Sequence, residues 1–74
     1  MRWVFKYVDP YHIHHHDVHL PKAHKYAKAM EQGAKFPPVQ VGKQNDGVLV
    51  SGDGAHRVMA AKLCGMKLFI KIKE

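Results

Sequence analysis

The amino-acid sequence predicts an α+β fold, in which a small mixed sheet of about four strands packs with two main helices in a single domain over residues 1–74. Two observations predict this class. Segments with strand-like and helix-like patterns follow one another in the order strand, short strand, helix, hairpin, helix, strand, with turn residues between them. The hydrophobic content of 46% is typical of a globular protein, and 74 residues suffice for one domain with a thin core. Any site must therefore lie on the surface of this domain or at an interface with another chain.

The first strand is expected over residues 2–8, which are aromatic and β-branched and are followed by an Asp-Pro pair. Trp3, Phe5 and Tyr7 alternate along this strand. Alternate residues share one face of a strand, so these rings either pack in the core or the sheet, or stack on nucleic-acid bases. The histidine-rich segment that follows is expected to be extended or a loop, with a short extended piece from Val18 to Leu20.

A first helix is expected from Pro21, which suits a first helical turn, to Gly33, which suits a helix stop. Between them an apolar stripe recurs at positions i, i+3, i+4 and i+7, formed by Ala23, Tyr26, Ala27 and Met30. The opposite side of the helix carries Lys22, Lys25 and Lys28. The pattern indicates an amphipathic helix with a basic outer face.

The second half of the chain is expected to form a hairpin, a helix and a last strand. Residues 39–50 contain two short strands around an Asp-Gly turn. Residues 55–64 are almost wholly apolar, which predicts a largely buried helix that ends at Gly65. Residues 67–73 alternate between aliphatic residues on one face and lysines on the other. These lysines either cover an edge strand or follow a phosphate backbone.

The charge of the chain favours anionic partners. A net charge of +6 suits nucleic acid, nucleotides or other phosphorylated molecules, and the alternative is a solvated basic surface without a specific partner. Cys64 is the only cysteine, so no disulfide can form within the chain, and its apolar surroundings predict a buried, inert thiol. The sequence shows neither a signal-peptide pattern nor an apolar run of membrane-spanning length. The expected location is cytoplasmic or nucleoid-associated, without a membrane partner.

The most informative stretch is the turn from Ser51 to Arg57, where a strand runs through Gly-Asp-Gly directly into a helix. Gly52 and Gly54 are expected to let the backbone take positive φ and approach a ligand closely. The amides of the first helical turn have no partner within the helix and carry the positive end of its dipole, where phosphates and carboxylates bind. The turn therefore predicts an anion site.

The charged residues of this turn support the same interpretation. His56 and Arg57 lie in the first helical turn, where a cation is disfavoured by about 0.3–1 kcal/mol unless an anion binds there. Arg57 can then donate a bidentate pair of hydrogen bonds to phosphate, and His56 can donate as well. Asp53 would cap the helix or hold a divalent metal that arrives with a nucleotide. The alternative is a capped strand-to-helix turn with a solvated Arg57.

The string Asp53-Gly54-Ala55-His56-Arg57, followed by Ala60-Ala61 and Gly65, resembles the signature of the ParB/sulfiredoxin superfamily. The matching stretch reads Gly-Cys-His-Arg in sulfiredoxins and Asp-Gly-His-His-Arg in free serine kinases, and it is arginine-rich in ParB proteins. Upstream, residues 36–41 resemble the proline-led strand of these families, and residues 20–33 resemble the helix before it. The resemblance covers roughly residues 17 to 73 and implies the ParB/sulfiredoxin fold.

The resemblance also implies a nucleotide or phosphate site. The His-Arg pair grips phosphates in sulfiredoxins, which implies that role for His56 and Arg57. A lysine of the first helix contacts phosphate there, and Lys25 is the best match, with Lys28 as its neighbour. The residues expected at the site are Gly52, Asp53, Gly54, Ala55, His56, Arg57, Lys25 and Lys28.

The chain departs from each of these families at a known functional position. Ala55 takes the place of the catalytic cysteine of sulfiredoxin, and Cys64 lies over two turns further along the helix, which excludes reduction of a sulfinic acid by that route. The arginine-rich box of ParB is reduced to Arg57, and no helix-turn-helix domain follows within the sequence. The catalytic glutamate of the free serine kinases cannot be placed. The resemblance therefore implies a phosphate-binding turn without a complete known active site.

A second cluster of candidate ligands lies between positions 12 and 19 and consists of His12, His14, His15, His16 and His19, with Asp17. On a strand, His14 and His16 would point to the same face, a spacing that can chelate zinc, copper or nickel. The predicted metal ligands are His14, His16 and Asp17. The alternatives are contact of one or two histidines with a phosphate ligand, and a polar loop.

The sequence thus favours binding of a phosphate-bearing ligand at residues 51–57, most simply ATP or CTP with Mg²⁺. Two alternatives stay open: a DNA- or RNA-binding module with nuclease activity, whose mark is a steep fall of affinity with salt, and a non-catalytic interaction protein that retains the fold. If the protein is an enzyme, the expected reaction is nucleotide hydrolysis, phosphotransfer or nucleic-acid cleavage. The sequence assigns no catalytic residue.

Overall fold

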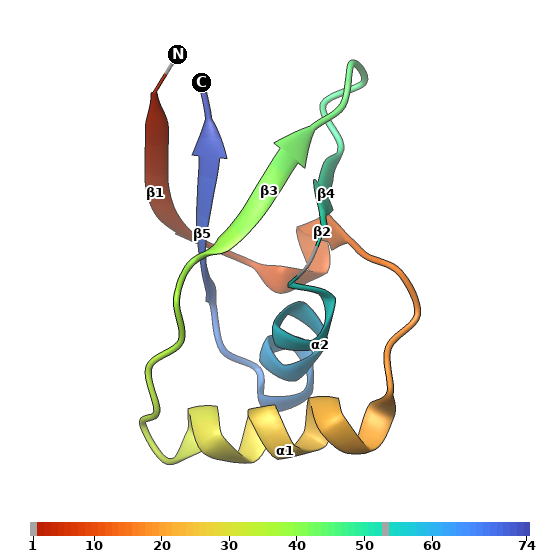
Figure 1. The fold of residues 1–74 in the computed structure, drawn as a ribbon, viewed down its shortest axis with the longest axis vertical. Helices are drawn as coiled ribbons and strands as arrows, with labels where there is room; N and C mark the ends of the chain where they lie inside the picture. The colour runs from red at the N-terminus through yellow and green to blue at the C-terminus, as the bar shows by residue number, and fades with distance from the viewer. Residues whose placement is uncertain (1, 53) are drawn as a thin grey trace.

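The computed structural model describes residues 2–52 and 54–74, which form strands, two α-helices and one short 3-10 helix, η1 (Figure 1). In chain order the elements are β1 (Trp3–Val8), η1 (Pro10–His12), β2 (Ile13–His14), α1 (Leu20–Glu31), β3 (Val39–Lys43), β4 (Leu49–Ser51), α2 (Ala55–Cys64) and β5 (Leu68–Lys73). The expected α+β class, the two main helices and the mixed sheet are therefore confirmed.

The sheet has five strands in the order β1-β5-β3-β4-β2, rather than about four. The additional strand is β2, which consists of two residues and pairs with β4 in parallel. β5 is parallel to β3 and antiparallel to β1, and β3 and β4 form the expected antiparallel hairpin. The two ends of the chain lie side by side (Figure 1), because Arg2 and Glu74 exchange two backbone hydrogen bonds of 3.0 Å.

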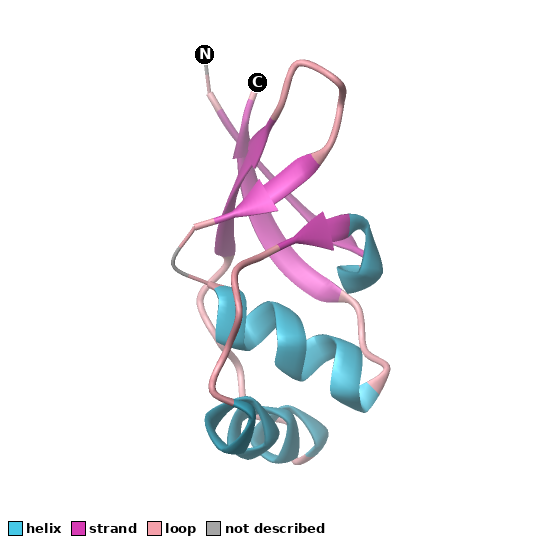
Figure 2. Cartoon of the chain, turned by 90° about the vertical axis from the view of Figure 1, so that its right-hand side faces the viewer, coloured by secondary structure: helices cyan, strands magenta, loops and turns pink. Residues whose placement is uncertain are grey.

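The sheet, α2 and α1 form three successive layers (Figure 2). The side chains of Val39, Ile70 and Val58 are fully buried where the sheet meets α2. α2 also buries Ala60 and Ala61, whose small side chains let neighbouring elements approach closely. α2 is therefore the central element of a core whose other members are Ile13, Ala27, Met30, Val41, Leu68 and Ile72.

The face of the sheet that points away from α2 is exposed at β1 and β5. We call it the open face and define it by Trp3, Phe5, Tyr7, Phe69, Lys71 and Lys73. The cross-strand pairs Trp3–Lys73, Phe5–Lys71 and Tyr7–Phe69 bring these side chains together. The rings of β1 are 38%, 54% and 66% exposed in chain order, whereas the alternate residues Val4 and Val8 pack on the core. The rings are therefore not in the core, but Phe5 and Tyr7 pack on the sheet against Phe69, as one of the expected arrangements has it.

The loops correct two expectations. Val18 to Leu20 forms no strand, because Leu20 already begins α1 and the strand of this region is Ile13–His14, although His19 has an extended backbone. Positive φ is not found at Gly52 or Gly54 but, among the described residues, at Gly33, Gly47 and Gly65, which follow α1, turn the hairpin and end α2. Glycine adopts the left-handed backbone conformation of these three positions readily, whereas other residues adopt it at a cost in free energy.

The expected buried state of Cys64 is only partly met, since the residue is half-buried and packs against the core cluster. Its Sγ lies 3.8 Å from the carbonyl oxygen of Ala61, one turn earlier in α2. In the described part of the chain, no helix is long and apolar enough to cross a membrane.

Candidate functional site

Gly54 begins the candidate site because it allows α2 to start against β3. A Cβ atom at this position would overlap Cγ1 of Val39 and lie 2.9 Å from its Cγ2, and Val39 is fully buried. The backbone φ of Gly54 is −93°, so glycine is required here by the lack of space and not by a left-handed conformation. Glycine at this position therefore fixes the distance between the helix N-terminus and the sheet.

The N-terminus of α2 is uncapped by a side chain at the N-cap position, because that position is Gly54. Its carbonyl accepts the first helical hydrogen bond from the amide of Val58, at 2.9 Å. The amides that precede Val58 in the first turn belong to the positive end of the helix dipole. An anion site at this turn stays a prediction.

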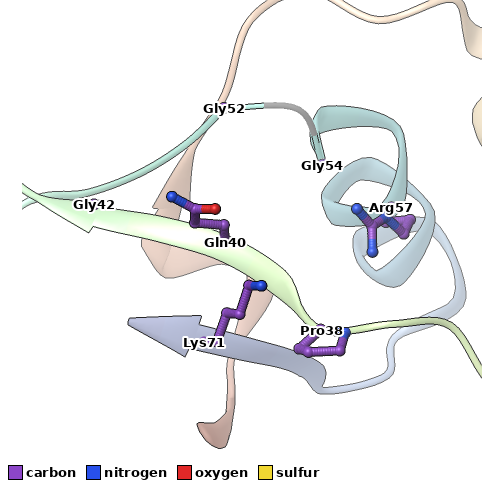
Figure 3. A pocket seen from close by; sticks show the side chains of 7 residues that line it. All are labelled: Pro38, Gln40, Gly42, Gly52, Gly54, Arg57 and Lys71. Carbon is purple, nitrogen blue, oxygen red and sulfur yellow. The ribbon is translucent and has the colours of Figure 1, made fainter. Parts of the chain in front are cut away.

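A cavity of about 340 Å³ lies beside this helix end (Figure 3). It is lined by Pro38, Gln40, Gly42, Gly52, Gly54, Arg57 and Lys71. Among the described lining residues the charged ones are Arg57 and Lys71, so the lining is basic. Figure 3 shows Gln40 on β3 and Lys71 on the neighbouring β5, with Arg57 reaching from α2 toward the same space. A cavity of this size is at the lower end of the range of about 300–1,000 Å³ for small-molecule sites.

Arg57 is held in place on the cavity wall. Its Nη1 donates a hydrogen bond to the carbonyl oxygen of Pro37, and the residue is half-buried. A guanidinium has five N–H donors in a fixed planar fork, so most of them stay available to a ligand. The Pro37 carbonyl therefore orients Arg57 without using up its capacity to bind a phosphate.

Gly52 leaves the mouth of the cavity open. A Cβ atom at Gly52 would meet no described heavy atom within 4 Å, apart from its chain neighbours, and the residue is exposed. The fold therefore does not require glycine here, because there is room for a side chain. Its effect is to expose the backbone of the turn to the cavity that it lines.

His56 does not line this cavity. Its Nε2 accepts a hydrogen bond of 3.1 Å from the backbone amide of His19, the N-cap residue of α1, and its ring meets Tyr26 edge-on at 6.5 Å between centroids. A second cavity, of about 510 Å³, is lined by His19, Pro21, Lys22, Lys25 and Tyr26. The structure therefore places Lys25 with the neighbours of His56, on a different cavity from Arg57.

The remaining predicted residues are distributed around the turn. Lys28 is exposed and lines neither of these two cavities, and Ala55 is half-buried in the first turn of α2. Asp53, predicted to cap the helix or to place a metal, lies outside the described residues. Ser51, which ends β4, is 1% exposed, and its Oγ has no hydrogen-bond partner among the described residues. Most buried hydroxyls in proteins have a partner, so this oxygen next to the turn is a candidate ligand contact.

Four lining residues were not predicted as site residues from the sequence: Pro38, Gln40, Gly42 and Lys71. Gln40 and Lys71 are neighbours because β3 and β5 pair in parallel, with Gln40 opposite Lys71. The alternation of β5 placed Lys71 on the non-core face. β3 and β5 are separated in the chain by β4 and α2. Their parallel pairing therefore has no local signal in the sequence.

The histidine cluster lies at the edge of the sheet that β2 forms, and β1 forms the other edge. His14, His15 and His16 line a cavity of about 380 Å³ together with Gln44, Asp46 and two valines, and Asp17 does not line it. The Nε2 atom of His15 lies 3.2 Å from Nζ of Lys62. Among the described residues, no three histidine, cysteine or acidic side chains are arranged to hold a metal ion. A metal at His14, His16 and Asp17 stays a prediction.

Comparison of the fold with solved structures identifies its class. The chain has a sulfiredoxin-like fold. It is similar to sulfiredoxin from Arabidopsis thaliana, with a TM-score of 0.77, 17% identity, and coverage of 96% of this chain and 85% of that one. It is equally similar to a C-terminally truncated SbnI from Staphylococcus aureus, with a TM-score of 0.77 and 22% identity over 95% of this chain. This chain spans 30% of the SbnI chain.

At the level of sequence, no protein-family model and no curated protein matches the chain. The comparisons therefore define the fold.

Proposed function

We propose that the protein binds a phosphate-bearing ligand, most simply ATP or CTP with Mg²⁺, in the cavity beside the N-terminus of α2. The observation that carries this proposal is the convergence of two cations, Arg57 and Lys71, on a cavity that also borders a helix N-terminus. Helix amides, an arginine fork and a lysine ammonium are complementary to phosphate in geometry and in charge. The resemblance to sulfiredoxin, in which a His-Arg pair grips phosphates, supports the same ligand class.

Each lining residue has a separate role in this proposal. Arg57 donates two parallel hydrogen bonds to one phosphate, and Lys71 neutralises charge from the sheet side. Gly52 and Gly54 leave the backbone open to the phosphate oxygens. Asp53 is proposed to help place Mg²⁺, because a carboxylate is a preferred ligand of this ion and the ion keeps contact with substrate phosphates.

His56 and Lys25 are proposed as contacts to a second part of the ligand. His56 Nε2 accepts the His19 amide, so the nitrogen must be unprotonated in this bond and cannot donate to a phosphate at the same time. Nδ1 then carries the ring proton, so His56 can donate to an anion through Nδ1 with this bond in place, and through Nε2 only if the bond opens. Lys25 lies on the cavity that adjoins this bond and would attract the anion there.

A titration followed by NMR tests the proposal. ATP, CTP and inorganic phosphate, each with and without Mg²⁺, are added to isotopically labelled protein, and the amide signals of residues 54–57 are expected to shift. Arg57→Ala should abolish these shifts, whereas Arg2→Ala, which removes the other arginine of the chain at the far end of the sheet, should leave them in place. Unchanged signals at 54–57 in all titrations would refute the proposal.

A DNA- or RNA-binding module with nuclease activity is the second candidate function. The observation that favours it is again the charge of the cavity, because a site with two cations can also take the phosphate of a nucleic-acid backbone. Affinity for a labelled oligonucleotide should then fall steeply with salt, and cleavage should require Mg²⁺. Binding that does not change with salt would count against this candidate.

A further inference from the structure

We infer that the open face of the sheet binds single-stranded nucleic acid, with bases on its rings and phosphates on its lysines. This inference goes beyond the proposed phosphate site, because its principal contacts, Trp3, Phe5 and Tyr7, lie on β1 and do not line that cavity. Large aromatic side chains are costly to leave in water. Their gathering on one exposed face therefore indicates a partner.

Three rings of the open face, those of Phe5, Tyr7 and Phe69, contact one another. Phe69 lies between its neighbours on β1, with its ring centroid 6.0 Å from that of Phe5 and 4.8 Å from that of Tyr7. These contacts hold the rings against one another while Phe5 and Tyr7 remain more than half exposed. A ring held in this way has already lost much of its side-chain freedom, so a base can stack on it at a smaller entropic cost.

The positive charge of the open face favours an anionic partner. The Nζ atoms of Lys71 and Lys73 lie 5.1 and 5.3 Å from the ring centroid of Trp3. The strand positions described on this face carry no carboxylate, and Glu74, on the opposite face, pairs with Lys6 at 3.7 Å. A second copy of the chain would bring the lysines of two such faces together, which is unfavourable. Aromatic rings interleaved with cations are instead complementary to bases joined by phosphates.

The spacing of the rings favours a single strand over a duplex. Alternate residues of an antiparallel strand are about 6.8 Å apart, twice the rise per residue. Base pairs in a duplex follow one another at about 3.4 Å, without room for a ring between them. A single strand can splay its bases and place them on successive rings. The geometry therefore points to an extended single strand along β1.

The open face adjoins the phosphate cavity through one residue. Lys71 is opposite Phe5 on one side and opposite Gln40 on the other, and both Lys71 and Gln40 line the cavity (Figure 3). A strand that lies on the open face can therefore continue with its backbone toward Arg57. Trp3 and Phe5 do not contribute to the cavity, so the two proposals can be separated by substitution.

The single tryptophan of the chain provides the measurement. Titration with oligo(dT) should quench the fluorescence of Trp3 with saturation, because a base stacked on the indole ring quenches its excited state by electron transfer at short range. A duplex of the same length should bind more weakly. Equal or tighter binding of the duplex, or unchanged Trp3 fluorescence at low salt, would overturn the inference.

Two substitutions distinguish stacking from general apolar contact. Phe5→Leu keeps an apolar side chain and should weaken oligo(dT) binding about five- to a hundredfold, the range found when a base loses its aromatic partner. Tyr11→Leu is the matched control, since Tyr11 is 69% exposed and has the Lys62 ammonium 5.6 Å from its ring, but lies in η1, outside the open face. Equal losses for both variants would contradict a role of the open face.

A third variant tests the phosphate contacts. Lys73→Gln should reduce the slope of log affinity against log salt by about 0.7, the value for one phosphate contact to a single strand. Arg57→Ala should abolish phosphate binding at the cavity while quenching by oligo(dT) persists. If sedimentation instead shows a dimer that Phe5→Leu dissociates, and oligo(dT) does not bind, the open face serves a second copy and the inference is wrong.

Discussion

The backbone amide of His19 donates a hydrogen bond to Nε2 of His56 across 37 positions of the chain. This bond joins the first residue before α1 to the first turn of α2, so it fixes where α1 begins on the surface of α2. Because Nε2 accepts in this bond, Nδ1 carries the ring proton that a phosphate ligand would need. The position of α1 and the state of the candidate site are therefore coupled.

His56→Ala should lower the free energy of unfolding by about 0.5–1.5 kcal/mol, the usual net contribution of one hydrogen bond. The loss is limited because water can reach the freed amide of His19, which is exposed. Urea denaturation measures the change. His24→Ala, on the exposed side of α1, is the control and should be nearly neutral. Identical stabilities of both variants and the parent would show that the His19 bond does not contribute.

Gly54→Ala should destabilise the fold by about 1–3 kcal/mol, because the added methyl group overlaps Val39 in a closely packed interior. A double-mutant cycle with Val39→Ala checks the cause. If the overlap is responsible, the double variant should be more stable than the sum of the single changes predicts. Strict additivity would assign the effect to something other than this contact.

Gly52→Ala should leave stability within about 0.5 kcal/mol of the parent, because a Cβ atom there meets no described neighbour. Because Gly52 lines the cavity, the same methyl group should weaken binding of ATP or phosphate. Thermal unfolding and the NMR titration measure the two effects separately. A variant that is fully stable and binds as the parent does would remove Gly52 from the site.

Lys71→Gln should weaken ligand binding about 10- to 100-fold, which corresponds to a charge-assisted hydrogen bond of about 1.5–3 kcal/mol. Lys28→Gln provides the comparison, since it removes the same charge from an exposed position that lines neither of the cavities at the turn. Isothermal titration with ATP and Mg²⁺ measures both. A greater loss with Lys28→Gln would favour the family alignment over the geometry of the cavity.

Ile70→Ala should cost about 2–5 kcal/mol, because the side chain is 0% exposed on the strand that joins β1 to β3. For a domain with a thin core this is a large part of the total stability. Phe5→Leu, on the open face, should change stability little. Similar losses for the two variants in urea denaturation would mean that the open face is covered in the folded protein.

Elements whose signals are local were predicted well from the sequence. The bounds of α2, Ala55–Cys64, agree with the expected helix over 55–64, because an apolar run between a glycine turn and Gly65 leaves few alternatives. The orientation of β1 could not be predicted in the same way. Both of its faces carry apolar residues, and the register with β5 aligns Val4 with Ile72 and Val8 with Leu68, so the valine face is the one that reaches the core.

The candidate site could be predicted only in part, because contacts between distant segments of the chain bring some of its residues into place. Arg57 and the two glycines follow from the turn itself, and the structure places all three on one cavity. The direction of His56 depends on where α1 begins, and the contribution of Lys71 depends on the parallel pairing of β3 with β5. Both are relationships between distant segments, which a motif of seven consecutive residues does not encode.

The paired ends of the chain have a consequence for how the domain can be built into larger proteins. Arg2 and Glu74 are hydrogen-bonded neighbours at one end of the sheet, far from α1 (Figure 1). A short peptide could join them, and new ends could be opened at the exposed hairpin turn around Gly47, giving a circular permutant with the same layers. By the same geometry, the whole unit could be inserted into a surface loop of a host protein with little separation of the host's two attachment points.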